Sequence, residues 1–187
     1  MHHIPNIISV LRVILVLPIA IQLYNEAWSS AFVLIFIAGI SDAIDGFLAR
    51  AFKWQSKLGS FLDPLADKLL LGVIFISLAY KGVIPVWLVV LVIARDTLIL
   101  MGAGFYQWIT QELTMSPLFI SKINTALQII FVLAMMYHLA IATLPQQSIF
   151  VLQIAVAVTT LLSGILYVKY WIEYTMLYFA DKKNNQK

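Results

Sequence analysis

Four aspartates stand close together in sequence that is otherwise strongly apolar. Asp42, Asp45, Asp63 and Asp67 lie inside or at the ends of apolar segments that are long enough to cross a bilayer. An ionised carboxylate near hydrocarbon is costly unless it faces a water-filled space and has a cationic partner, so an acidic residue there indicates a functional site. Four such residues together predict a shared counterion.

The spacing of these aspartates predicts which of them share a helix face. Residues at i, i+3, i+4 and i+7, or at i, i+4 and i+8, lie on one side of an α-helix. The first such stripe contains Asp42, Asp45, Gly46 and Ala49, and the second contains Gly59, Asp63 and Asp67. A short basic segment joins the two helices, so we expect the stripes to face each other at one end of an antiparallel pair. Hard divalent cations such as Mg²⁺ or Mn²⁺ would neutralise the clustered carboxylates.

Simpler explanations exist for each part of this pattern. The small residues either leave room for a ligand against the backbone or allow tight helix packing. The acids could instead cap helices or form ordinary ion pairs with Arg50, Lys53, Lys57 or Lys68. A cap or an ion pair explains one acid well, but two facing stripes favour a binding site.

The composition indicates a membrane protein. Of the 187 residues 62% are hydrophobic and 11% are charged, whereas an ordinary soluble domain has roughly 25% charged residues. We therefore predict an all-α integral membrane protein in which residues 1–187 form a single domain. The chain has no cysteine, which excludes disulfides and thiolate metal sites. Its net charge of +3 gives no indication of nucleic-acid binding.

Apolar stretches predict six transmembrane helices. They cover residues 6–24, 29–50, 62–80, 84–107, 119–143 and 149–170. Lys and Arg are retained on the cytoplasmic side of a membrane, and with six spans all of the 12 basic residues except Lys81 lie on the side of the termini. We therefore expect both termini and the four aspartates to be cytoplasmic.

The segment that contains the aspartates resembles a known signature. It reads D-A-I-D-G-F-L-A-R from Asp42, then eight further residues, then G-S-F-L-D-P-L-A-D ending at Asp67. This resembles the signature D-x2-D-G-x2-A-R-x8-G-x3-D-x3-D of the CDP-alcohol phosphatidyltransferase family at every fixed position. The six predicted helices are also similar to the fold of that family.

The resemblance implies an enzyme of phospholipid biosynthesis that transfers the phosphatidyl group of CDP-diacylglycerol to an alcohol and releases CMP. It implies two bound metal ions, Mg²⁺ or Mn²⁺, that hold the pyrophosphate, with the four aspartates as ligands and Asp67 also as the general base. By position in the motif, the CDP part of the substrate would be bound by Asp42, Gly46, Ala49, Arg50 and Gly59.

Two later segments bear on the acceptor alcohol. I-A-R-D at 93–96 and F-I-S-K-I-N-T-A-L-Q at 119–128 resemble cardiolipin synthases of the CDP-alcohol type more than phosphatidylglycerophosphate synthases, which usually have Glu in place of Asp96 and Lys in place of Asn124. We therefore predict phosphatidylglycerol as the acceptor, bound near Arg95, Lys122 and Asn124, with glycerol 3-phosphate as the alternative. Arg95 and Lys122 could instead extend to the membrane interface. Asp96 is expected to pair with a neighbouring cation.

Other functional classes fit less well. An ion channel or a proton-coupled transporter uses polar groups along a path across the bilayer, whereas here the acids cluster near one face and the outer halves of the spans are apolar. A purely structural membrane protein would not need four carboxylates. The sequence leaves open whether the chain forms a homodimer.

Overall fold

The computed structural model describes residues 4–51, 59–110 and 118–184, with side chains described for 13–41, 67–102, 104, 118–173 and 176. These ranges contain six helices and no strand. The helices are α1 (Ile4–Tyr24), α2 (Trp28–Ala51), α3 (Gly59–Tyr80), α4 (Val86–Thr110), α5 (Phe119–Ala140) and α6 (Gln146–Asn184). The prediction of an all-helical chain is confirmed, and each predicted span lies on one helix.

The helix ends lie within three residues of the predicted bounds, except at the end of α6. α6 has 39 residues and ends at Asn184, beyond the predicted end at residue 170. A search for apolar stretches does not detect a helix that continues into polar sequence, and Lys182 and Lys183 are good helix formers. α5 ends at Ala140, and Pro145 in the following connection cannot continue a helix because it has no backbone N–H.

Two helical stretches with described side chains are long and apolar enough to cross a membrane. They are Phe119–Ala140 and Gln146–Glu173, and two shorter apolar stretches are Val13–Tyr24 and Trp28–Ser41. Large apolar side chains cover much of the outer surface; Leu17 is 68% exposed and Val90 is 60% exposed. Such a surface suits contact with lipid. Six membrane-spanning helices stay a prediction.

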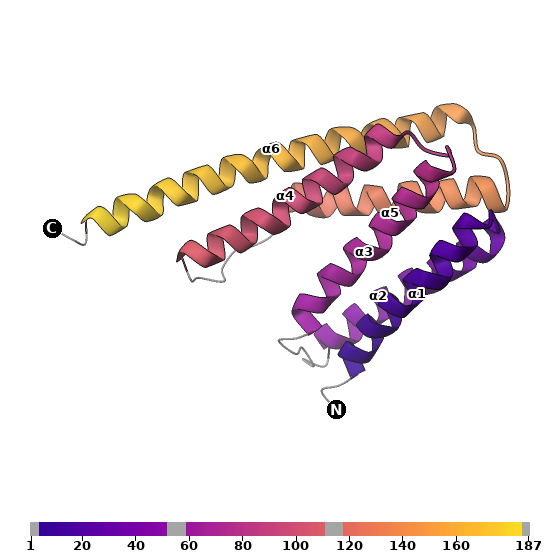
Figure 1. The fold of residues 1–187 in the computed structure, drawn as a ribbon, viewed down its shortest axis with the longest axis horizontal. Coiled ribbons are helices and arrows are strands. Elements are labelled where there is room, and N and C mark those ends of the chain that lie inside the picture. The colour runs from indigo at the N-terminus through magenta and orange to yellow at the C-terminus, as the bar shows by residue number, and fades with distance from the viewer. Residues whose placement is uncertain (1–3, 52–58, 111–117, 185–187) are drawn as a thin grey trace.

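The helices pack as two groups that meet along α5. α1 contacts α2 and α3, and both α4 and α5 contact α6. The groups join where α2 and α3 contact α5 and where α3 contacts α4. Phe75 of α3 and Phe131 of α5 are both fully buried at this junction, with ring centroids 6.0 Å apart. Figure 1 shows α4 and α6 running side by side while α1, α2 and α3 run together below them.

Two tight turns mark one end of the bundle. Glu26, with φ 58°, follows α1, and Gly82, with φ 70°, follows α3. In both turns the next residue donates its backbone N–H to a carbonyl five residues earlier, which is a common way to end a helix. Lys81 Nζ lies 3.0 Å from Glu26 Oε1, so an ion pair joins these two turns. The aspartates lie toward the opposite ends of their helices.

Candidate active site

The predicted metal-binding aspartates lie on two helices at the same end of the bundle. Asp42 and Asp45 belong to the C-terminal part of α2, and Asp63 and Asp67 to the N-terminal part of α3 (Figure 1). The predicted site residues whose side chains lie outside the described set are Asp42, Asp45, Gly46, Ala49, Arg50, Gly59 and Asp63. Within the described side chains there is no group of three or more His, Cys, Asp or Glu that could hold a metal. The roles of these residues therefore stay predictions.

Asp67 lies beside an apolar cavity. Its side chain is partly buried and lines a cavity of about 390 Å³ between α2, α3 and α5. Apart from Asp67 and Thr125 the lining is apolar, with Ile35 from α2, Leu71 from α3 and Ile129 from α5 among its members. An apolar space with a few polar groups at one place fits a ligand that has a polar head and hydrocarbon tails.

Arg95 is the centre of a polar cluster inside the bundle. The side chain is 4% exposed. Its Nε donates a hydrogen bond to Ser163 Oγ at 3.1 Å, Nη1 donates to Asp96 Oδ1, and Nη2 donates to the hydroxyls of Ser121 and Ser163. The guanidinium also lies 5.9 Å from the ring centroid of Tyr167, within the range of a cation–π contact.

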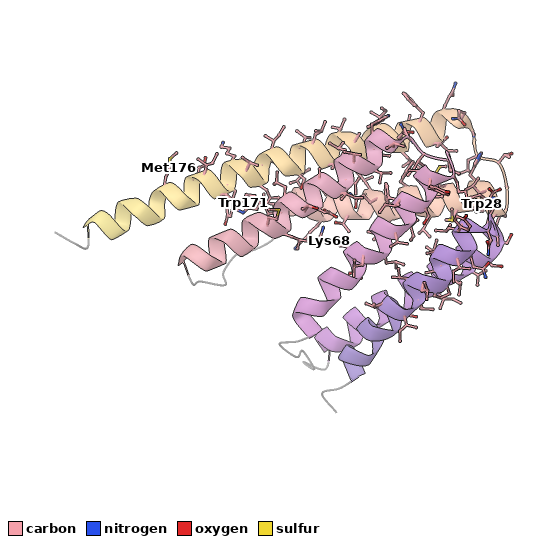
Figure 2. All side chains as sticks on the ribbon, viewed as in Figure 1. Trp28, Lys68, Trp171 and Met176 are labelled. Carbon is pink, nitrogen blue, oxygen red and sulfur yellow. The ribbon has the colours of Figure 1, made fainter. Side chains whose placement is uncertain are left out.

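An ion pair connects this cluster to α3. Lys68 Nζ lies 2.6 Å from Asp96 Oδ1, so Asp96 accepts from both Lys68 and Arg95. The expectation that Asp96 pairs with a neighbouring cation is confirmed. We call Lys68, Arg95, Asp96, Ser121 and Ser163 the Arg95 cluster. It links α3, α4, α5 and α6, and Figure 2 shows Lys68 between α3 and α4.

The other two predicted acceptor-binding residues lie in different surroundings on α5. Asn124 is fully buried, and its Oδ1 accepts hydrogen bonds from the hydroxyls of Thr159 and Thr160, both at 2.9 Å. Its Nδ2 has no hydrogen-bond partner among the described residues. Lys122 is exposed. Contact of Arg95, Lys122 or Asn124 with an acceptor stays a prediction.

The sequence did not predict that Lys68, Ser121 and Ser163 belong to the same site. Serines in apolar helices often form hydrogen bonds between helices, which gives a reason to single out Ser121 and Ser163. Their common partner depends on the way α5 and α6 pack around α4, and the spacing along one helix carries no information about that packing. The contact of Lys68 with Asp96 is likewise a property of the bundle.

Comparison with known proteins shows the family. The model for the CDP-alcohol phosphatidyltransferase family matches residues 2–167. The chain is 36% identical to "Cardiolipin synthase (CMP-forming)" of Rattus norvegicus over 147 residues, which are 70% of this chain and 49% of that protein.

A second relative carries a different name. The chain is 36% identical to "CDP-diacylglycerol--glycerol-3-phosphate 3-phosphatidyltransferase 1, chloroplastic" of Oryza sativa subsp. japonica over 188 residues, which are 90% of this chain and 57% of that protein. The chain thus spans about half the length of the curated relatives it matches. The extent of the family match together with these identities shows that the chain belongs to the CDP-alcohol phosphatidyltransferase family.

Proposed function

We propose that this protein transfers the phosphatidyl group of CDP-diacylglycerol to phosphatidylglycerol, forming cardiolipin and releasing CMP. The observation that carries the proposal is the position of Asp67 beside the cavity between α2, α3 and α5. A phosphatidyl donor needs polar groups for its pyrophosphate next to space for acyl chains, and this cavity offers both at one place. The relatives named as cardiolipin synthases support the same activity.

The donor set fits a divalent metal. Asp42, Asp45, Asp63 and Asp67 would offer carboxylate oxygens, which are the preferred ligands of Mg²⁺ and Mn²⁺. Two metal ions held there would neutralise the charge that develops on the pyrophosphate. Gly46, Ala49 and Gly59 would leave room for the cytidine, and Arg50 would contact a phosphate.

The reaction then needs few further groups. The acceptor hydroxyl oxygen attacks the lipid-side phosphorus, a new P–O bond forms, and the P–O bond to CMP breaks with its electron pair staying on CMP. The hydroxyl proton passes to the carboxylate of Asp67, which acts as general base. The product keeps the phosphodiester charge, and the acyl chains of the donor stay in the apolar cavity throughout.

The charges on α4 and α5 support phosphatidylglycerol as the acceptor. Arg95 is buried inside the bundle, where it shares Asp96 with Lys68. Among the described residues of these two helices, exposed Lys122 is the remaining cation without an ion-pair partner. One free cation suits the single charge of a phosphodiester, whereas a phosphate monoester with nearly two charges is better bound by several cations. Glycerol 3-phosphate is the second candidate, because the rice relative is named for that acceptor.

The membrane arrangement is part of the proposal. The exposed apolar surface and the two bilayer-length helices support six transmembrane helices in one domain of residues 1–187. The distribution of Lys and Arg supports cytoplasmic termini and a cytoplasmic active site. We also propose that two copies of the chain form a homodimer. The mass of the purified protein in detergent tests this.

The test is a reconstitution with one acceptor at a time. Purified protein receives labelled CDP-diacylglycerol with phosphatidylglycerol, glycerol 3-phosphate, inositol phosphate or serine, and CMP and lipid products are measured. We expect cardiolipin with phosphatidylglycerol. Asp67→Asn should reduce turnover far more than binding of the CDP-lipid, and Glu26→Gln at the opposite end of the bundle serves as the matched control. Ready use of glycerol 3-phosphate with no use of phosphatidylglycerol would overturn the acceptor but leave the family activity.

A further inference from the structure

Asp67 and Lys68 are consecutive residues on α3, and they face different neighbours. Asp67 lines the cavity beside α2 and α5, whereas Lys68 pairs with Asp96 of α4. Consecutive residues of an α-helix are turned by about 100° around its axis, so the rotation of α3 that brings Lys68 to Asp96 also fixes the direction of Asp67. We propose that the Arg95 cluster sets this rotation and that Asp96 and Arg95 are positioning residues for Asp67.

The cluster is built to hold Asp96 in one place. Arg95 donates to Asp96 and is itself fixed by hydrogen bonds to Ser121 of α5 and Ser163 of α6. The side chains of Arg95 and Asp96 are 4% and 19% exposed. Removal of the carboxylate would leave two cations, Lys68 and Arg95, without their shared partner in a largely buried place, which is strongly unfavourable. α3 would then lose its ion pair with α4.

A small rotation is enough to affect a reaction at Asp67. Side-chain atoms lie about 5–6 Å from a helix axis, so a turn of about 10° moves them by about 1 Å. Misplacement of a reacting group by about 1 Å can cost on the order of 100-fold in rate. This inference rests on the proposed function, because it takes Asp67 as the group that acts on the acceptor hydroxyl.

A positioning role differs from direct contact of Arg95 with the acceptor. Direct contact predicts that loss of the cluster raises KM for the acceptor, whereas positioning predicts a fall in kcat with little change in either KM. A purely structural role predicts less folded protein with unchanged kcat per folded molecule. The kinetic constants therefore separate the three roles.

The first experiment is a double-mutant cycle with Lys68→Met, Asp96→Asn and the double variant. We expect each single variant to lower kcat by about 10-fold or more. The double variant should have a kcat no lower than that of the more impaired single variant, because both changes remove the same Lys68–Asp96 contact. Lys68→Arg keeps the ion pair and should retain most of the kcat. Lys81→Met, which breaks the Lys81–Glu26 pair at the other end, is the matched control and should keep wild-type kcat. Additive losses in the cycle, or a change in KM alone, would overturn the proposal.

The second experiment measures the rotation of α3 without any turnover. The chain has no native cysteine, so Leu71→Cys, one turn after Asp67 in the cavity lining, gives a single reporter for a methanethiosulfonate reagent. Ile129→Cys reports from α5 on the same cavity. We expect Asp96→Asn to change the modification rate of Cys at 71 and to leave the rate at 129 unchanged. If the modification rate at position 71 is the same in the Asp96→Asn protein as in the protein that keeps Asp96, the positioning role is refuted, even if the wild-type protein releases CMP. Absence of CMP release from wild type would refute the proposed function alone.

Discussion

A substitution at Gly102 tests how closely α4 and α6 approach each other. A Cβ atom built on Gly102 would overlap the six-membered ring of Trp171, which lies against this part of α4 (Figure 2). Trp171 has limited room to retreat, because its ring also packs against Tyr167 with centroids 5.9 Å apart. We therefore expect Gly102→Ala to force the two helices apart or to displace the indole.

The size of the effect follows from two opposing terms. Insertion of one methyl group into a close-packed contact costs about 1–3 kcal/mol, while replacement of Gly by Ala in a helix gains up to about 1 kcal/mol from the lower conformational entropy of the unfolded chain. Gly104 provides a matched control on the same helix, since a Cβ there meets no atom within 4 Å. Gly104→Ala should therefore show the gain alone.

The assay is thermal unfolding of the purified variants in one detergent, followed by the loss of soluble monodisperse protein. We expect Gly102→Ala to unfold on the order of 5 °C below Gly104→Ala, as a difference of 1–3 kcal/mol implies for about 190 residues. Trp171→Phe in the same chain should recover part of the loss, because a smaller ring leaves room for the methyl group. Equal stability of the two alanine variants would show that Trp171 does not pack on Gly102.

Three further predictions concern the site. Asp63→Asn should abolish CMP release while the protein still folds, because an amide is a poorer ligand than a carboxylate for a hard cation. EDTA should abolish CMP release by wild type, because it removes the metal. Full activity in either case would exclude a metal role. Asn124→Lys should lower the free energy of unfolding by more than about 2 kcal/mol, because it buries an unpaired ammonium, and Asn124→Leu should cost less; a stable lysine variant in a denaturation series would contradict the buried position. Ile129→Trp should raise KM for CDP-diacylglycerol by filling the cavity, whereas Ile130→Trp, at a similarly exposed position outside the cavity lining, should not. Equal KM values would exclude this cavity as the lipid site.

The helices could be predicted from the sequence because long apolar stretches separated by polar breaks are typical of helices. The end of α6 could not be predicted, because the helix continues into polar residues that a search for apolar stretches does not include. The bundle arrangement was also beyond the sequence. We expected the stripes on α2 and α3 to face each other at one end of the pair; most of their side chains lie outside the described residues, so this stays a prediction. Where side chains are described, α1 contacts both helices, and a cavity that α5 helps to line lies between them.

The site residues divide in the same way. The aspartates could be singled out from the sequence because charged groups in apolar sequence are rare and their spacing repeats on a helix face, and their roles stay predictions. Asn124 was assigned to the acceptor from the resemblance of residues 119–128 to cardiolipin synthases. Its complete burial against Thr159 and Thr160 depends on which face of α5 meets α6. The amphipathic pattern of a membrane helix is weak, since both lipid and core are apolar, so the sequence gives little information about that face.

The contacts between α4 and α6 explain why the described part of the bundle combines a glycine, a serine and aromatic rings at one interface. Arg95 contacts Ser163, and Gly102 lies against Trp171 about two turns further along both helices, so the two helices run in the same direction. Arg95 and Gly102 are seven residues apart and therefore lie on one face of α4. Ser163 gives the guanidinium a hydrogen-bond acceptor without a further charge, and Gly102 lets the backbone approach the indole. Close packing at Gly102 thus holds α6 where Ser163 can fix Arg95, and through Asp96 it bears on the orientation of α3.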